Sequence, residues 1–293
     1  MASSSSSYAL SDLENVDMFC FQCEQTLHGK GCTTKGVCQK DANVAALQDY
    51  LMHAVEALCA VAYTARERAG IALDNDLQRL IVEAVFCTLT NVCFTEAEVL
   101  EYAEACNQRR EGLLKKVRDA GVEDAVAPLG REFRHITDPA AAKAFAKSNL
   151  QIPLSMRKLG MDKACIREFL VYGIKGTAAY TFHAMVLGES CDDVVNRLVD
   201  YLGHEMHRDD ATESDLWGLC LDCGKTNFAA MEHLDRANTN TYGAPEPTVV
   251  QWITDPEEGS THPGKAILVS GHDLLELKML LDQTAGTGIQ VYT

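Results

Sequence analysis

The sequence lacks the features that mark several large classes of protein. It has no uninterrupted run of 18 or more apolar residues, so we expect no membrane-spanning helix. Basic residues are scarce: 26 lysines and arginines stand against 42 aspartates and glutamates, which gives a formal net charge of -16. Nucleic acids and anionic membrane surfaces are bound through basic patches, so neither is an expected partner. The chain also has no G-x-G-x-x-G motif, Walker loop or G-x-S-x-G turn, which removes three common signs of nucleotide binding and hydrolysis.

Lysine and arginine are absent from the first 17 residues, which are rich in serine and carry three acidic side chains. Organellar presequences are also serine-rich, but they are rich in arginine and poor in acid. We therefore predict a disordered tail over 1–17 and a cytoplasmic protein, with an organellar presequence as the alternative. The whole chain, with 293 residues and 47% hydrophobic content, is large enough for two domains with ordinary cores.

Cysteine, by contrast, is abundant, and four of the twelve cysteines fall within nineteen residues. Cys20, Cys23, Cys32 and Cys38 have the spacing C-x2-C-x8-C-x5-C, in a segment (18–40) with almost no aliphatic side chains. Such a segment cannot form a hydrophobic core of its own, and thiolate ligands select zinc or an iron–sulfur cluster. Structural zinc sites usually contain short C-x2-4-C knuckles, and five residues between the second pair are wide for one. The spacing therefore favours iron–sulfur, with zinc and unrelated free thiols as alternatives.

The other eight cysteines are expected in or near the core, in a reducing compartment. Cys220 and Cys223 form a C-x2-C pair, but both fall within a predicted helix, whereas a thioredoxin-like site needs a preceding strand. His204 and His207 are three residues apart, not the four of a zinc-protease helix, and we predict a solvated helix end there. The remaining six cysteines are Cys59, Cys87, Cys93, Cys106, Cys165 and Cys191.

From residue 41 to about 240, apolar residues recur at helical spacing and no convincing strand is found. Thr95 and Glu98 form a T-x-x-E capping box, flanked by Phe94 and Val99 as a hydrophobic staple, so a helix should begin there. We predict a mainly α domain over 41–240 in which helices pack on helices. The expected helices span 41–69, 75–91, 95–121, 138–148, 160–188, 190–202 and 212–237.

After a proline-containing linker at 242–248, the pattern changes to strand and helix. Residues 265–270 form an apolar run typical of a buried parallel strand, 274–283 an amphipathic helix, and 289–293 a second strand. Two strands do not make a stable sheet, and a parallel sheet needs helices on both faces. We therefore predict an incomplete α/β domain over 249–293 and expect the chain to be truncated.

His272 follows the first of these strands, at the carboxyl edge of the sheet where α/β proteins bind ligands. Asp273 is placed to cap the following helix and so to fix the turn. Local sequence alone favours an ordinary turn histidine beside a helix cap.

Longer motifs run in order along the chain. M-F-C-F-Q-C-E-Q-T at the start is followed by G-C-T-T-K-G-V-C and A-A-L-Q-D. Further stretches lie at 167–180 (R-E-F-L-V-Y-G-I-K-G-T-A-A-Y), 183–188, 237–243 and 269–274. Together they closely resemble the hybrid cluster protein family (prismane proteins or hydroxylamine reductases), and the likeness covers nearly everything from residue 18 to 293.

The resemblance implies two metal sites. In the family branch with this cysteine spacing, Cys20, Cys23, Cys32 and Cys38 would bind a [4Fe–4S] cluster, whereas a branch with wider spacing holds [2Fe–2S]. A hybrid [4Fe-2O-2S] cluster is bound in the family by one histidine, two glutamates, four cysteines and a nearby lysine, and His272 corresponds to that histidine. The chain ends before the H-G-E motif that supplies the first glutamate, so most hybrid-cluster ligands are expected to be missing. No catalytic side chain is assigned, because His272 would be a ligand and neither an acid nor a base.

The resemblance also implies an activity and an architecture. The intact protein would be an oxidoreductase of nitrogen metabolism that reduces hydroxylamine to ammonia and water, with related roles in nitric oxide handling. The [4Fe–4S] cluster would relay electrons from an external donor protein to the hybrid cluster. The architecture would be a cysteine loop (18–40), a helical domain of two bundled halves, and the start of a Rossmann-like α/β domain. Two alternatives are a non-catalytic iron–sulfur electron-transfer module and a zinc-stapled helical interaction domain.

Overall fold

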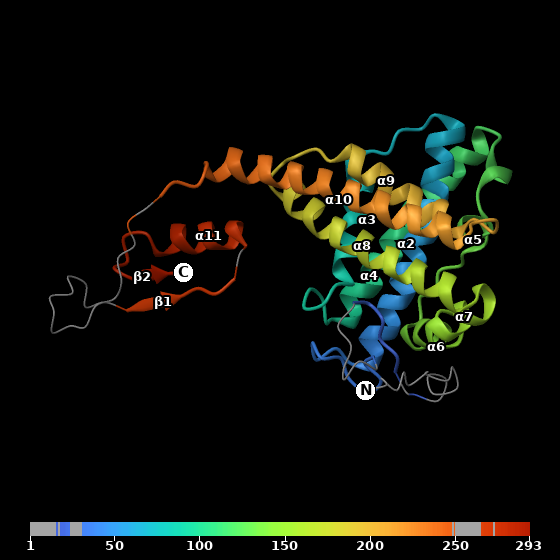
Figure 1. Cartoon of the computed structure of the whole chain (residues 1–293), viewed down its shortest axis with the longest axis horizontal. Helices are drawn as coiled ribbons and strands as arrows, with labels where there is room; N and C mark the ends of the chain where they lie inside the picture. The colour runs from blue at the N-terminus through green and yellow to red at the C-terminus, as the bar shows by residue number, and fades with distance from the viewer. Residues whose placement is uncertain (1–15, 17, 24–30, 248, 250–264, 272) are drawn as a thin grey trace, which may run out of the picture. The chain divides into compact units, whose positions relative to one another are not determined.

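The computed structural model describes residues 16, 18–23, 31–247, 249, 265–271 and 273–293, and they form two units. The first unit is Met1–Gly243 and the second is Ala244–Thr293. The first is built from helices, as Figure 1 shows, which confirms the predicted mainly α fold. Its described helices are α2 (Ala42–Ala69), α3 (Asn75–Cys87), α4 (Glu96–Asp119), α5 (Pro128–Glu132), α6 (Pro139–Asn149), α7 (Ile152–Leu159), α8 (Met161–Val186), α9 (Asp192–Gly203) and α10 (Glu213–Tyr242), with short 3-10 helices η2 (Glu123–Ala125) and η3 (Glu205–His207).

Helix α2 is the centre of this unit. It begins where the Asp41 carboxylate accepts hydrogen bonds from the backbone N–H groups of Asn43 and Val44, both at 2.9 Å. It ends at Gly70, whose φ of 65° is the left-handed conformation that glycine adopts at helix ends. By length and composition α2 could cross a membrane, but 89% of the relevant window is buried inside the unit. Helices α4, α5, α6 and α9 pack around it, as expected for the core helix of a bundle.

The contact between α2 and α9 depends on a glycine. Gly203 is the last residue of α9 and lies directly against the Cys59 backbone of α2. A Cβ atom at position 203 would overlap the carbonyl group of Cys59. The two helices can therefore approach this closely only if the side chain at 203 is a hydrogen atom.

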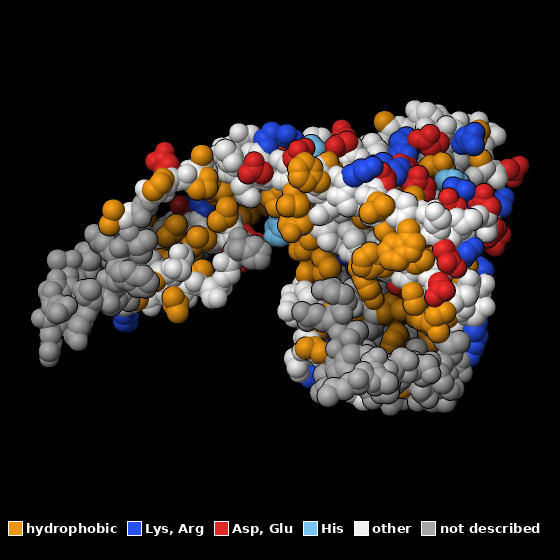
Figure 2. Space-filling view, in the orientation of Figure 1, with side chains coloured by type: hydrophobic (Ala, Val, Ile, Leu, Met, Phe, Trp, Pro, Cys, Tyr) orange, Lys and Arg blue, Asp and Glu red, His pale blue; other side chains and the backbone are white. Residues whose placement is uncertain are grey.

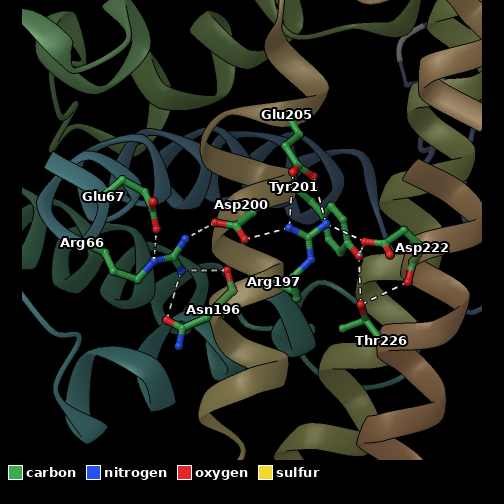
Figure 3. A network of polar contacts seen from close by, with 9 residues as sticks. All are labelled: Arg66, Glu67, Asn196, Arg197, Asp200, Tyr201, Glu205, Asp222 and Thr226. Carbon is green, nitrogen blue, oxygen red and sulfur yellow. Dashed lines mark hydrogen bonds and ion pairs between the residues drawn. The ribbon is translucent and has the colours of Figure 1, made fainter. Parts of the chain in front are cut away.

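A polar network fastens α10 and α9 to the rest of the unit (Figure 3). The Arg197 guanidinium donates hydrogen bonds to Asp200 at 2.8 Å and to Glu205 at 3.1 Å. It also donates to Asp222 of α10 at 2.5 Å, and the Tyr201 hydroxyl donates to the same carboxylate at 2.7 Å. Because each buried or half-buried charge has partners, the network joins helices without leaving a carboxylate unpaired. Its members are Arg66, Glu67, Asn196, Arg197, Asp200, Tyr201, Glu205, Asp222 and Thr226.

The predicted capping box at Thr95 is wrong, although a helix does begin there. Thr95 is the residue before α4, but its side chain makes no capping hydrogen bond. Glu98 instead accepts a hydrogen bond from the Cys93 thiol, with Sγ and Oε2 3.4 Å apart. The capping box occurs at α10, where Thr212 accepts from the Asp215 backbone N–H and the Asp215 carboxylate accepts from that of Thr212.

The second unit is a β-α-β unit. Strands β1 (Ala266–Leu268) and β2 (Gln290–Tyr292) pair in parallel, and α11 (Leu274–Thr284) connects them. Asp273 caps α11 as predicted, since its carboxylate accepts from two backbone N–H groups at 2.9 and 3.1 Å. The expectation that the first strand is buried is wrong: Leu268 is 81% exposed, and none of the described residues of this unit is buried. Two short strands with one helix have too little apolar surface to cover either face.

The close approach at Gly203 gives a first prediction. Gly203→Ala should lower the free energy of unfolding by about 2 kcal/mol, because the new methyl group forces α9 away from α2. Urea unfolding followed by circular dichroism measures this change. Gly112→Ala in α4 is the matched control. Among the described residues, no atom outside its own stretch of helix lies within 4 Å of its Cβ position, so that variant should be stabilised by about 0.5–1 kcal/mol. Equal stability of the two variants would contradict the packing described here.

Candidate metal centre

The cysteine loop is held in shape by a few backbone hydrogen bonds. The backbone N–H of Cys20 donates to the Cys32 carbonyl at 3.0 Å, which pairs the two arms of the loop. A tight turn follows, in which Gly36 N–H donates to the Lys40 carbonyl at 2.8 Å. Gln39 has a φ of 77°, a left-handed conformation that is uncommon for a residue with a side chain. This conformation directly follows Cys38 and turns the chain back toward α2.

The structure brings all four predicted cysteines together around one small cavity. Cys20, Cys23, Cys32 and Cys38 line it, with Lys40 and Thr90 among the other residues of its wall. Gly36 also lines the cavity, and a Cβ atom there would be 3.0 Å from the Cys38 Sγ atom. The loop therefore needs a small residue here to let the backbone pass beside a sulfur.

Lys175 reaches the loop from the core. It lies in the middle of α8, its side chain is 1% exposed, and its ammonium donates to the Gln22 backbone carbonyl at 3.3 Å. It also donates to the Gln22 side-chain oxygen. The Gln22 amide in turn donates to Asp49 of α2, whose second carboxylate oxygen accepts from Gln151 at 2.9 Å. Gln22 lies between Cys20 and Cys23, so this chain of hydrogen bonds anchors the C-x2-C turn to α2 and α8.

A second buried lysine anchors the other end of the loop. Lys40 is 2% exposed, and its ammonium donates to the Gln48 side chain and, at 3.4 Å, to the Thr88 carbonyl. Gln48 is itself fixed because its amide donates to the backbone carbonyls of Cys87 and Cys93, at 3.3 and 3.1 Å. Both ends of the cysteine loop are thus attached to the helical core through fully buried amines.

Burial, nearby charge and hydrogen bonds change the pKa values of the loop thiols. Burial raises the pKa of the Cys20 thiol, although the positive charge of Lys40 acts in the opposite direction. Burial also acts to raise the pKa of Cys38, but hydrogen bonds from the Lys40 backbone and the Thr90 hydroxyl outweigh it. The pKa of Cys38 is therefore lowered, which favours the thiolate that a metal needs.

Burial also changes the pKa values of the charged residues that anchor the loop. Burial lowers the pKa of Lys175 to about 8, and the charge of Lys40 acts in the same direction. Burial raises the pKa of Asp49 to about 7, against the lowering effect of its hydrogen bond from Gln22 and the charge of Lys175. The charge of Glu168 also acts on Lys175, so carboxylates balance part of the positive charge close to the loop.

The arrangement of the thiols bears on which metal fits them. Among the described residues, no three His, Cys, Asp or Glu side chains converge tightly enough to hold one metal ion. The four thiols nevertheless surround one cavity. In a cubane cluster each thiolate binds a different iron, so the ligand sulfurs stand farther apart than around a single zinc ion. By the chemistry of its donors, this quartet of thiols around one cavity fits an iron–sulfur cluster or a zinc ion.

Next to this loop lies a second, polar cavity. Arg167 donates to Nδ1 of His207 at 3.1 Å, which leaves the ring proton on Nε2, and that atom is buried without a hydrogen bond. The nearest carboxylate oxygen, from Glu56, is 3.8 Å away, and burial raises the pKa of Glu56 to about 7. The predicted solvated end is confirmed at His204 and at 208–210, which are exposed, but it is wrong for the His207 ring, which η3 turns toward α2 and α8. Ionisable residues of the cavity wall are Asp49, His53, Glu56, Arg167, Glu168 and Lys175.

The remaining candidate residues have different outcomes. His272 lies outside the described residues, so its role stays a prediction. Cys220 and Cys223 both lie within α10, and Cys223 is buried, as expected for structural cysteines. Cys165 is exposed on α8, so its predicted place in or near the core is wrong. Five other cysteines are buried as predicted: Cys59, Cys87, Cys93, Cys106 and Cys191.

Sequence reasoning missed the residues that support the loop. Gln22, Lys40 and Asp49 are close to the cysteines in the sequence, but nothing in their spacing marks a buried polar network. Lys175 is 153 residues away from Gln22. Its one signal was its position inside the 167–180 motif, where a lysine interrupts an otherwise apolar helix face.

Comparison with known proteins agrees with the family likeness. The model of the Prismane/CO dehydrogenase family matches residues 18–293. The chain is 40% identical over 277 residues to a hydroxylamine reductase of Maridesulfovibrio salexigens, a match that covers 94% of this chain and 48% of that protein. Hydroxylamine reductases of Methanocella arvoryzae and Rhodospirillum rubrum are 38% and 37% identical, each covering 94% of this chain and 49% of the relative. The chain thus spans about half the length of these relatives, and it belongs to the Prismane/CO dehydrogenase family.

Proposed function

We propose that this chain binds a [4Fe–4S] cluster on Cys20, Cys23, Cys32 and Cys38 and serves a hydroxylamine reductase. The observation that carries the proposal is the cavity lined by these four thiols, in a loop that two buried lysines attach to the core. Names of relatives that are about 40% identical support the same activity. The overall reaction would take two electrons and two protons, break the N–O bond of hydroxylamine, and release ammonia and water.

The residues of this chain would act on the cluster rather than on the substrate. A bound [4Fe–4S] cluster supplies one electron at a time. Lys40 and Lys175 supply positive charge close to the cavity, which stabilises thiolates and the additional electron of a reduced state. Gln22, which accepts hydrogen bonds from Lys175, would hold the first two cysteines in place.

His272 remains a proposed ligand of a hybrid cluster. It would follow β1 and precede Asp273, whose capping hydrogen bonds fix the start of α11. Its partners in such a site would have to come from polypeptide outside the segment that this chain matches, since one histidine cannot assemble a polynuclear centre.

An external protein is the proposed electron donor. The net charge of -16 favours a donor with a basic docking surface, because opposite charges speed encounter and orient the partners. We propose a cytoplasmic location, as expected for a protein with many cysteines in a reducing compartment.

Metal and sulfide analysis tests the cluster. Protein prepared without oxygen should contain about four irons and about four acid-labile sulfides per chain, with broad visible charge-transfer absorption. Cys38→Ser should reduce both contents strongly, because it removes one of four thiolate ligands. Cys165→Ser changes an exposed cysteine of α8 and should leave them unchanged. One zinc per chain without sulfide would contradict the proposal and support the zinc-stapled alternative.

A kinetic assay separates the enzyme from an electron-transfer module. With reduced viologen as the donor, we expect iron-loaded chain alone to transfer electrons but not to reduce hydroxylamine. The physical reason is that one histidine cannot assemble a polynuclear centre, so His272 would need co-ligands from further polypeptide. Ammonia formation is the measurement. Steady turnover by the chain alone would show that the second site needs no further polypeptide.

Replacing the buried lysine tests the anchoring of the loop. Lys175→Met should lower the free energy of unfolding by about 3 kcal/mol, since it leaves Gln22 and Asp49 buried with a missing partner. It should also lower the iron content, because the C-x2-C turn loses its attachment to α8. Lys163→Met on the same helix is the control, and its ammonium contacts the Ala211 carbonyl instead.

A double variant separates loss of charge from loss of fold. Lys175→Met combined with Asp49→Asn removes both buried charges and should recover part of the stability. Urea unfolding and iron content are measured on all variants. A Lys175→Met protein with the stability and iron content of the wild type would show that this hydrogen-bond chain does not support the loop.

A further inference from the structure

One side chain from outside the cysteine loop reaches the thiol cavity. Of the residues described around this cavity, Thr90 alone comes from outside the segment 20–40. It lies in the turn between α3 and α4, and its hydroxyl group hydrogen-bonds to the Cys38 thiol. The hydroxyl group is therefore placed to act on one ligand of the proposed cluster.

The turn that carries this threonine is fixed at both ends. The Gln48 amide donates to the backbone carbonyls of Cys87 and Cys93, which flank the turn, at 3.3 and 3.1 Å. The buried Lys40 ammonium donates to the Thr88 carbonyl at 3.4 Å. Because Lys40 also donates to the Gln48 side chain, the turn and the end of the cysteine loop share the same anchors.

The backbone of the next residue completes the placement. Asn91 has a φ of 62°, a left-handed conformation that asparagine adopts more readily than most residues. A residue stays in this conformation where the surrounding contacts determine it, and here it turns the chain directly after Thr90. The fold of the turn thus holds the hydroxyl group against Cys38.

The chemistry of the two groups sets the direction of the hydrogen bond. A cysteine sulfur that is bound to a metal carries no proton and can only accept, whereas a hydroxyl group can donate. The Lys40 backbone N–H also hydrogen-bonds to the Cys38 sulfur, so this ligand has two donors. Of the two, only the Thr90 hydroxyl depends on the identity of a side chain. Hydrogen bonds to ligand sulfurs tune the reduction potential of a cluster, because they stabilise the additional negative charge of the reduced state.

We propose that Thr90 raises the reduction potential of the cluster by donating a hydrogen bond from its hydroxyl group to the Cys38 sulfur. The inference rests on the iron–sulfur cluster of the proposed function. Thr90 acts through Cys38, so it is a positioning residue and not a ligand. Its methyl group only fills the wall of the cavity, whereas its hydroxyl group makes reduction by the external donor easier.

Potentiometric titration of the iron-loaded chain, followed by electron paramagnetic resonance, tests this role. Thr90→Val keeps the shape of the side chain and removes the donor. At a fixed potential, its ratio of oxidised to reduced cluster should be at least about threefold higher than in the wild type, a shift of about 30 mV to lower potential. Thr90→Ser keeps the hydroxyl group and should restore most of the wild-type potential.

A matched control separates the hydrogen bond from other effects of losing a hydroxyl group. Thr95→Val changes an exposed threonine of the same connection between α3 and α4, whose side chain makes no capping hydrogen bond. Its potential should equal that of the wild type. Iron and sulfide contents should be unchanged in all three variants, because no ligand is replaced.

The possible failures can be told apart. Equal potentials for Thr90→Val and the wild type would overturn the role of Thr90 and leave the cluster in place. A Thr90→Ser potential as low as that of Thr90→Val would overturn it too, and so would a Thr90→Val chain without a cluster, since the side chain would then only support the cavity wall. A wild-type chain that binds no iron–sulfur cluster would instead overturn the proposed function.

Discussion

The hydrogen bonds from Lys175 to Gln22 are the contact on which the arrangement of the candidate site depends. The cysteine loop contributes little apolar surface and cannot fold by hydrophobic burial. A buried ammonium that reaches the turn between two cysteines replaces that missing core. Because a buried lysine is costly without partners, the contact fixes the positions of Gln22 and Asp49 together. The loop and the bundle therefore form one structure, although 153 residues separate the two ends of this contact.

Helix α8 has two sides with different surroundings. Its inner side carries Lys175 toward the cysteine loop and packs against α3, α7 and α10. Its outer side carries Phe169 and Tyr180, which remain exposed. On α10, the Arg197 network anchors the side that carries Asp222 (Figure 3). Trp217 and Leu221 lie on another side of this helix and are exposed. Figure 2 shows hydrophobic side chains gathered over α8 and α10.

Much of this could be predicted from local sequence, and the rest could not for identifiable reasons. Helix periodicity predicted α2 and α8 to within a few residues, because a buried stripe recurs every 3.6 positions. The four cysteines could be predicted as one site because they are close in sequence and chemically distinctive. Lys175 could not, since its partner is distant and a lysine has no characteristic pattern when buried. The capping box at Thr95 failed because Glu98 had a competing partner in Cys93. The exposure of Leu268 could not be predicted, because the burial of an apolar strand depends on which other elements pack on it, and no local pattern reports this.

Charge balance connects the fold with the chemistry proposed for the loop. Lys40 and Lys175 bring two positive charges close to the cysteine loop, where the carboxylates of Asp49 and Glu168 balance part of them. An excess of buried positive charge is unfavourable unless an anionic group compensates it. Four thiolates around a metal centre would provide that compensation, for zinc as well as for an iron–sulfur cluster. The positive charges are thus compatible with thiolates around a metal centre of either kind, and the family likeness is what favours the iron–sulfur cluster proposed above. A bound cluster would give the lysines a role that the helical bundle alone does not require.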